Sequence, residues 1–337
     1  MQYSKEKLEE LVARWKTKKG IQTLKTIKKT NCFLNPIEFH EKIKNFPGIT
    51  DEEIVNTVDL RGAPLAGFDF RIPIEEEHDG YFENIAILSN ISFEGANLKH
   101  CVFEDGSIHE CYFENTNLSH ADFNNADISN CSFENAIIIG TSFRGTKLAS
   151  CNFTDAELKD LSLDSTIIDE KSHFGKELKS EKEKNFHMAA IELKQIKEMY
   201  KNSSLHELAD KYHYKEMIAK RKKRNISHPL RWINYIFGDL LCKYGTSYWR
   251  VFFWSVTIMI ICALLYQKHD GLLYQAQEVE LTFLDSLYFS SVTFTTLGYG
   301  DLHAVGLMRQ LAAAEGFIGA ALMSLFTVIM ARNIIRD

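Results

Sequence analysis

The chain has 337 residues, which is long enough for two or three domains. Its net charge of −6 combines an acidic region, 88–170, with basic residues that flank two apolar segments near the C-terminus. The seven cysteines include no C-x-x-C pair and the twelve histidines have no metal-ligand spacing, which argues against a disulfide framework and a zinc site.

Residues 1–55 are mixed in charge and have apolar residues at a helical spacing. The apolar stripe consists of Leu8, Leu11, Val12 and Trp15. Helices of this kind are expected to cover the open end of the repeat region that follows, since a stack of repeats needs a terminal cap. Charges begin at Lys5 and no apolar core follows them, so we expect no cleavable signal peptide.

A repeat of five residues runs through the next region. Every fifth residue from 88 onward is apolar: Leu88, Phe93, Leu98, Phe103, Ile108, Phe113, Leu118, Phe123, Ile128, Phe133, Ile138, Phe143, Leu148, Phe153, Leu158, Leu163 and Ile168. Most are preceded two residues earlier by a small side chain, as at Ala96, Cys101, Cys111, Ala121, Ala126, Cys131, Ala136, Cys151 and Ala156. A period of five fits neither a helix nor a strand. It fits a coil with four faces, in which both residues point inward.

The same spacing begins earlier in another phase. Its apolar residues are Leu60, Leu65 and Phe70, preceded by Val58, Ala63 and Phe68. Residues 71–85 then form an insertion between coils, expected to be a loop. This stretch, 56–170, resembles the pentapeptide-repeat family, which implies a right-handed quadrilateral β-helix. Twenty repeats at four per coil predict five coils, or a rod of about 24 Å.

The repeat region carries fourteen acidic residues against four basic ones between 88 and 170, a balance of −10. One interpretation is that acidic outward positions keep a stack with exposed strand edges soluble. A second is mimicry of DNA, as in some pentapeptide-repeat proteins. A third is that the charge raises the local concentration of cations such as K⁺, an effect that salt would screen.

Residues 171–228 are predicted to form a cytoplasmic helical hairpin. The first helix is expected over 182–201, and Ser204 is expected to cap the second with Glu207 at its third position. The segment resembles the connector between pentapeptide repeats and pores in related chains, and it acts either as a coupler or as a spacer. A basic cluster ends it: Lys220, Arg221, Lys222, Lys223 and Arg224. This cluster is expected to contact anionic lipid rather than nucleic acid, and 229–247 to form a helix along the membrane interface.

Two apolar segments, 248–267 and 305–331, are near the length that a membrane helix needs. Basic residues precede the first segment, and Arg332 and Arg336 follow the second. The charged residues between them are mostly acidic: Lys268 stands against Asp270, Glu278, Glu280 and Asp301. The positive-inside rule therefore predicts that both termini lie in the cytoplasm.

A short helix and a glycine-rich loop are predicted between these spans. Thr282 is expected to cap a helix over 282–294, too short to cross the membrane, with Asp285 completing a capping box. The loop, 295–301, reads Thr-Thr-Leu-Gly-Tyr-Gly-Asp. Gly298 and Gly300 allow the positive-φ conformations that turn successive carbonyls toward one axis, and Thr296 can add a hydroxyl ligand.

Residues 248–337 resemble the two-transmembrane potassium channel pore, in which four subunits each donate one filter strand. The resemblance implies that main-chain carbonyls coordinate K⁺ at four residues: Thr296, Leu297, Gly298 and Tyr299. Leu297 replaces the more common Val or Ile. Tyr299 favours K⁺ over other cations, because related non-selective channels lack this tyrosine.

Further residues are expected to support the filter: Thr295, Gly300, Asp301, Tyr288 and Phe289, of which the last two would pack behind it. Val292 stands where some family members place a glutamate that couples to the position of Asp301.

Gating residues are predicted in the second span. Gly316 and Gly319 are hinge candidates, with Gly319 at the position where family members bend; close helix packing is the alternative role for both. Phe326 or Ile329 would narrow the inner mouth. Glu315 is costly in a membrane, so we expect a functional role or a hydrogen bond behind the filter.

The whole chain is thus expected to be multidomain, with helices over 1–55, a β-helix over 56–170, an α-helical connector over 171–228, an interfacial helix over 229–247 and an α-helical pore over 248–337. The expected function is K⁺ conduction by a homotetramer in a prokaryotic cell membrane, with K⁺ as permeant ion, no cofactor and an unidentified cytoplasmic partner of the β-helix. The alternative is a membrane-tethered acidic scaffold whose pore is non-conducting or non-selective. No phosphate-binding loop, nucleophile elbow or histidine–carboxylate pair suggests an enzyme.

Overall fold

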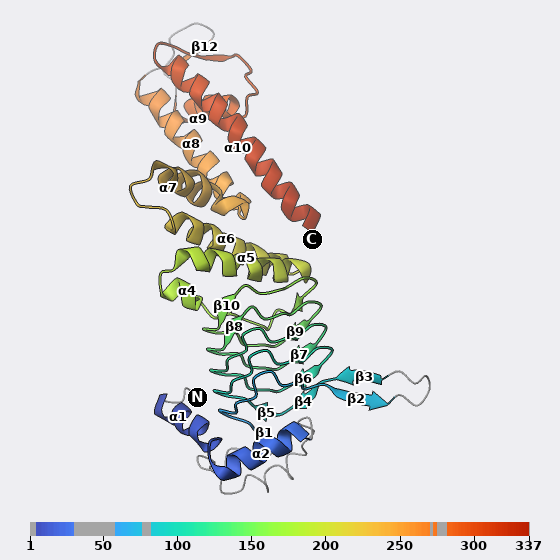
Figure 1. Cartoon of the computed structure of the whole chain (residues 1–337). Coiled ribbons are helices and arrows are strands. Elements are labelled where there is room, and N and C mark those ends of the chain that lie inside the picture. Colours follow the sequence, from blue (N-terminus) through green and yellow to red (C-terminus); the bar gives the residue numbers. More distant parts are fainter. Residues whose placement is uncertain (1–4, 30–57, 76–81, 270–271, 275–281, 337) are drawn as a thin grey trace. The chain divides into compact units, whose positions relative to one another are not determined.

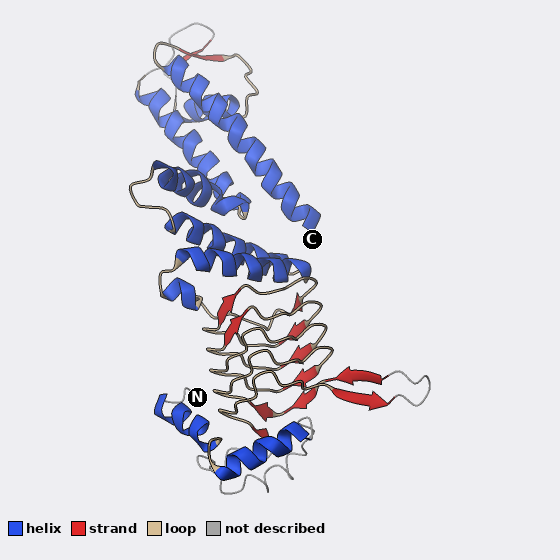
Figure 2. Cartoon of the chain, in the orientation of Figure 1, coloured by secondary structure: helices blue, strands red, loops and turns tan. Residues whose placement is uncertain are grey.

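The computed structural model describes residues 5–29, 58–75, 82–269, 272–274 and 282–336. The chain divides into two units, Met1–Lys223 and Arg224–Asp337. In Figure 2 the first unit contains strands and helices, and the second is almost entirely helical. Each unit is described separately below.

A β-solenoid forms the centre of the first unit, as predicted. Its main face is a parallel five-stranded sheet of β4 (Ile87–Ser89), β6 (Ser107–His109), β7 (Asp127–Ser129), β9 (Lys147–Ala149) and β11 (Ile167–Ile168). Paired residues in neighbouring strands are one turn apart in the sequence, as Ile108 and Ile128 are. Two other pairs lie on further faces: β8 (Ile137–Ile139) with β10 (Glu157–Lys159), and β1 (Val58–Asp59) with β5 (Ile91–Ser92). The sheet from β4 to β11 covers about four turns, and 58–70 adds part of another before them rather than a complete fifth coil.

The interior contains the predicted apolar residues in stacked columns. One column runs through Phe93, Phe113, Phe133, Phe153 and Phe174, with neighbouring rings about parallel. All of the predicted inward apolar residues are buried except Leu163, which is half-buried against the end of the stack. Non-glycine residues in the left-handed conformation recur between the faces, as at Asn115 and Asn135. Asparagine and aspartate are among the residues that tolerate this conformation best.

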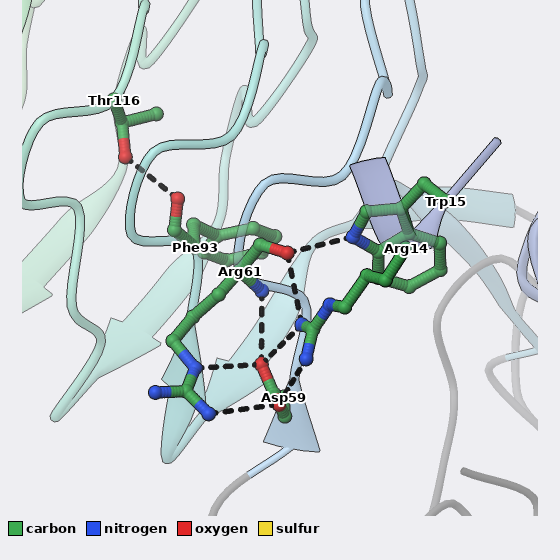
Figure 3. Close-up of polar contacts among 6 residues, drawn as sticks. All are labelled: Arg14, Trp15, Asp59, Arg61, Phe93 and Thr116. Carbon is green, nitrogen blue, oxygen red and sulfur yellow. Dashed lines mark hydrogen bonds and ion pairs between the residues drawn. The ribbon is translucent and has the colours of Figure 1, made fainter. Parts of the chain in front are cut away.

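Threonines also take the small inward position, which we had not predicted. Thr116 Oγ1 donates a hydrogen bond of 2.8 Å to the Phe93 carbonyl oxygen (Figure 3). Thr141, Thr146 and Thr166 make the same bond to a carbonyl 23 residues earlier. The buried hydroxyl is thereby satisfied, so a threonine replaces alanine or cysteine at little cost.

Two helices cover the first turn of the solenoid, α1 (Lys5–Arg14) and α2 (Lys18–Lys29) (Figure 1). Leu11 and Trp15 are buried as predicted, but Val12 is 39% exposed and does not belong to the packed stripe. The ring of Trp15 donates a hydrogen bond from Nε1 to the Arg61 carbonyl oxygen at 2.6 Å. These two helices lie where the sequence predicted a terminal cap, and residues 30–57 lie outside the described part.

A buried ion-pair network joins this cap to β1. Asp59 accepts hydrogen bonds from Arg14 at 2.7 and 2.9 Å and from Arg61 at 3.0 and 3.1 Å (Figure 3). Burial opposes ionisation of Asp59, but the hydrogen bonds from Arg14 and then Arg61 lower its pKa to about 2. The carboxylate is therefore charged throughout the physiological range.

The insertion before β4 is a hairpin arm rather than a loop alone. Strands β2 (Ile72–Glu75) and β3 (Phe82–Ile85) pair antiparallel, and the arm projects sideways from the solenoid in Figure 1. At its base Arg71 is paired with Asp69 at 2.9 Å and with Glu104 at 2.7 Å. Little in the sequence indicated this pair, because β2 reads Ile-Pro-Ile-Glu and a proline is uncommon inside a strand.

The predicted helical hairpin covers the other end of the solenoid. It consists of α5 (Phe186–Asn202) and α6 (His206–Lys222), after the short α4 (Lys179–Lys182). The phenylalanine column continues through Phe174 into the stacked rings of Tyr200 and Tyr212. The Tyr200 hydroxyl also donates to the Ser172 carbonyl oxygen at 2.8 Å. The hairpin is therefore built onto the last turn as its cap.

The predicted cap of the second helix was wrong. Leu205 is the N-cap residue of α6 and makes no side-chain capping bond. Ser204 has a φ of 59° and lies in the turn after α5. A left-handed residue at this place ends the preceding helix, whereas an N-cap needs an extended backbone.

The second unit begins with α7 (Pro229–Ile233), the π-helix η1 (Asn234–Leu240) and the 3₁₀ turn η2 (Lys243–Gly245). Helices α8 (Tyr248–Lys268) and α10 (Met308–Arg336) follow, with α9 (Phe283–Phe294) between them. Strands β12 (Leu272–Tyr274) and β13 (Leu302–Ala304) pair antiparallel. The second long helix starts at 308 rather than 305, because the residues before it belong to this strand pair and a turn. Both long helices are apolar enough to cross a membrane.

Candidate ion-conduction site

A capped half-helix leads into the glycine-rich loop, as predicted. Thr282 Oγ1 accepts a hydrogen bond from the Asp285 main-chain nitrogen, and the Asp285 carboxylate accepts one from the Thr282 nitrogen at 2.9 Å. This is a capping box, which fixes the start of α9. The helix ends at Phe294, so its partially negative carbonyl end meets residues 295–301.

The backbone of the loop alternates in conformation. Thr296, Gly298 and Gly300 have φ values of 60°, 56° and 77°. Leu297 and Tyr299, which lie between them, are not among the residues with positive φ. Alternation between left-handed and ordinary conformations turns successive carbonyls to one side of the chain, the arrangement that a carbonyl ion filter needs. The glycines were expected from the sequence; a left-handed threonine at 296 was not.

One of the two residues expected behind the filter contacts its end. Tyr288 donates from its hydroxyl to Asp301 Oδ2 at 3.0 Å. Phe289 instead packs edge-to-face on Tyr266 of α8, with ring centroids 5.0 Å apart. The Asp301 carboxylate thus has a partner on α9 although Val292 carries no acid.

Helix α10 contacts α9 at two points four residues apart. The Ser290 hydroxyl makes a hydrogen bond with Glu315 Oε1, and the Tyr266 hydroxyl is 2.7 Å from Oε2 of the same carboxyl. One turn further along both helices, Gly319 lies against Phe294. A Cβ built on Gly319 would be 2.1 Å from the Phe294 carbonyl oxygen, which is impossible without movement.

Sequence reasoning identified Glu315 and Gly319 but not their partners. Ser290 and Tyr266 were missed because Ser290 is one of several polar residues in α9 and Tyr266 is an ordinary residue of the apolar helix α8. The available signal was spacing: Ser286 and Ser290 are four residues apart, on one face of α9, and both are buried in the structure. A buried serine in a membrane segment usually has a hydrogen-bond partner.

The remaining gate candidates lie as follows. Gly316 has more space than Gly319, with a Cβ 3.6 Å from the nearest atom outside its helix, the Thr293 carbonyl oxygen. Phe326 packs edge-to-face on Tyr248 of α8 at 6.1 Å. Ile329 is buried with Val251 and Leu322. Both apolar side chains therefore have packing partners in α8 or α10 of the same chain.

The basic cluster at the end of α6 is partly engaged by the protein. Lys220 donates to Glu216 at 2.5 Å and Lys223 is 3.1 Å from His187 Nδ1. Burial opposes ionisation of Glu216, but hydrogen bonds from His213, Lys220 and Lys197 lower its pKa to about 2. Glu216 is therefore a permanent anion, and it directs part of the cluster toward the protein. Within the described residues, no group of three or more His, Cys, Asp and Glu side chains could hold a metal.

Comparison with known families matches both halves. Residues 251–336 match the family described as ion channel, and residues between 86 and 163 match pentapeptide repeats in eight copies. The chain joins pentapeptide repeats to an ion-channel segment. The family match and the two apolar helices together indicate a membrane protein.

Several solved structures are similar in part, all of them pentapeptide-repeat proteins. Rfr23 from the cyanobacterium Cyanothece 51142 is 20% identical with a TM-score of 0.22, over 26% of this chain and 64% of its own. HetL from the cyanobacterium Nostoc is 20% identical with a TM-score of 0.29, over 33% and 47%. A protein of the Arabidopsis thaliana thylakoid lumen is 26% identical with a TM-score of 0.21, over 30% and 66%. The matched region therefore spans about half to two thirds of these proteins, and such scores carry no functional argument. No curated protein matches this chain.

Proposed function

We propose that this protein is a K⁺-selective channel whose pore is formed by four copies of the chain, each donating residues 295–301. The observation that supports this most is the alternation of left-handed residues at 296, 298 and 300. It occurs at the end of a capped half-helix and between two helices long enough to span a membrane. Carbonyls on one side of the loop can replace the hydration shell of K⁺.

Several large apolar side chains are exposed in a single chain, which supports the association of several copies. Leu297, Tyr299 and Phe317 are 62%, 69% and 79% exposed. Large apolar side chains next to a loop that carries ions are expected to be covered by neighbouring copies. The homotetramer, with K⁺ coordinated by the carbonyls of 296–299, is therefore part of the proposal.

Ion flux into vesicles tests the proposal. The purified chain is reconstituted into vesicles loaded with K⁺, and flux is followed with a dye while the outer solution holds Na⁺. We expect K⁺ flux from the wild-type protein and its loss in Gly300→Ala. Gly306→Ala is the matched control, because Gly306 also has a positive φ (57°) and open space around its Cβ position but lies outside the filter.

The outcomes separate the two readings of this chain. Equal flux of Na⁺ and K⁺ would overturn selectivity, and no flux from a well-folded tetramer would favour the acidic, membrane-tethered scaffold. The mass of the detergent-solubilised particle tests the tetramer directly. Loss of flux in both glycine variants would show only that backbone strain is harmful.

The role proposed for the solenoid is regulation or assembly. Support comes from the way in which α5 is built onto the last turn: the Ser203 hydroxyl accepts from the Ile168 nitrogen at 2.8 Å, and Gln195 Nε2 donates to the Leu161 carbonyl oxygen at 3.3 Å. A hairpin fixed to the solenoid favours a coupler over a flexible spacer. Deletion of 58–170 should therefore change open probability or tetramer yield, measured in bilayers and by particle mass.

A further inference from the structure

Glu315 is buried in the second unit at 1% exposure. Three side chains interact with its carboxyl: Ser290 of α9, and Tyr266 and Cys262 of α8. None of the three carries a positive charge. An ionised carboxylate buried without a cation is costly, and more so in a helix that crosses a membrane.

The Ser290 hydroxyl makes two oxygen–oxygen contacts but has only one hydrogen to donate. The Ser290 oxygen lies 2.9 Å from the Met259 carbonyl oxygen and also within hydrogen-bond distance of Glu315 Oε1. A serine hydroxyl has one hydrogen and a main-chain carbonyl has none. If Glu315 were ionised, one of these two oxygen–oxygen contacts would have no hydrogen between its atoms.

A hydrogen on Glu315 Oε1 satisfies all the contacts. Oε1 then donates to the Ser290 oxygen, and Ser290 donates onward to the Met259 carbonyl. Tyr266 donates to Oε2 of the same carboxyl at 2.7 Å. These three hydrogen bonds then have one hydrogen each, and the branch through Ser290 runs from α10 through α9 to the Met259 carbonyl of α8.

We propose that Glu315 is a positioning residue that stays a neutral carboxylic acid and holds the pore helix α9 between α8 and α10. The inference rests on the proposed channel function for its consequence, which is that the filter depends on this hydrogen bond. Ser290 lies one turn before the end of α9, directly ahead of 295–301. The titratable groups that face the carboxyl are Tyr266 and Cys262, both from α8, while α9 contributes only the serine.

Three variants separate a donated hydrogen from simple space filling. Glu315→Gln keeps the shape, donates to Ser290 through its amide and accepts from Tyr266, so we expect K⁺ flux and the K⁺ preference over Na⁺ to remain. Glu315→Ala and Ser290→Ala break the link, and we expect the K⁺-to-Na⁺ preference to fall by at least about tenfold. Retained preference in both alanine variants would overturn the positioning role.

Infrared difference spectroscopy tests the hydrogen without any need for ion flux. The spectrum of the wild-type protein minus that of Glu315→Gln, at neutral pH, is expected to contain the carbonyl band of a protonated carboxylic acid, shifted in Ser290→Ala. A carboxylate band in its place would overturn the proposal even if the channel conducts. The protonated band in a protein that conducts no K⁺ would leave the neutral acid standing and reject the proposed function.

Discussion

Close approach at a single residue decides how α10 meets the pore helix. The Phe294 carbonyl oxygen occupies the place where a side chain on Gly319 would begin. Glu315 is one turn away on the same face and reaches Ser290. A glycine here is explained by packing against the end of α9, and this contact offers a route by which movement of α10 reaches the filter.

Gly319→Ala should therefore impair conduction, since its Cβ would be 2.1 Å from a main-chain atom and the two helices must separate. We expect K⁺ flux to fall by at least tenfold, at a cost of about 1–3 kcal/mol for overpacking. Gly316→Ala is the control, because its Cβ makes an ordinary contact at 3.6 Å. Bilayer recordings measure both; a wild-type open probability in Gly319→Ala would contradict the packing role and the hinge alike.

At the other end of the chain, Asp59→Asn leaves Arg14 and Arg61 buried without their anion. We expect the first turn to lose about 3 kcal/mol of stability, because removal of one partner from a buried pair exposes the cost of burying the other. Asp69→Asn is the matched control in an exposed pair and should cost at most about 1 kcal/mol. Hydrogen exchange over 58–70 in the intact protein measures both, and similar exchange in the two variants would refute the difference.

Among the elements, the solenoid was predictable because the inward and outward positions of each repeat are visible in its own five residues. Burial at Phe113 or Phe133 follows from a period of five residues, whatever the rest of the chain does. Contacts between distant elements were not predictable: Ser290 meets Glu315 only because two helices cross, and no local pattern encodes the crossing. The prediction that Ser204 caps α6 was wrong for a local reason. Ser204 adopts the left-handed conformation in the turn that follows α5, so it cannot be the N-cap residue.

The first complete turn should respond to pH through Glu94. Burial, and then the charge of Glu114, raise the pKa of Glu94 to about 7. An unfolded glutamate titrates near 4.5. The folded pKa is the higher one, so the contribution of Glu94 to stability is fully present below pH 4.5 and is lost as the pH rises from there through about 7.

We therefore expect hydrogen exchange over 86–105 to become faster between pH 5 and pH 8, after correction for the intrinsic rate, and Glu94→Gln to remove most of that change. Peptides from 146–165 in the same sample are the internal control. A pH response of equal size in the control peptides would show that the effect is not local to Glu94.

Over the whole molecule, charge and exposure together predict which side of the membrane each part occupies. Basic residues precede the first span and follow the second, whereas the charged residues between the spans are mostly acidic. The positive-inside rule therefore predicts that both termini lie in the cytoplasm. The six described cysteines are all free and buried, so they react poorly with bulky reagents. A Cys32→Ser protein should therefore react little with maleimides, so that a single added cysteine can be detected against it.

Leu307→Cys and Glu170→Cys then report the two sides. Leu307 is 75% exposed between the filter and α10, and Glu170 is exposed at the end of the solenoid. In intact cells a membrane-impermeant maleimide should label Leu307→Cys. It should label Glu170→Cys only after the membrane has been permeabilised with detergent. The opposite pattern would put the solenoid outside, where it could not sense the cytoplasm, and would turn the filter inward. Labelling of both thiols in intact cells, with the Cys32→Ser background unlabelled, would reject a topology in which the membrane separates the two sites.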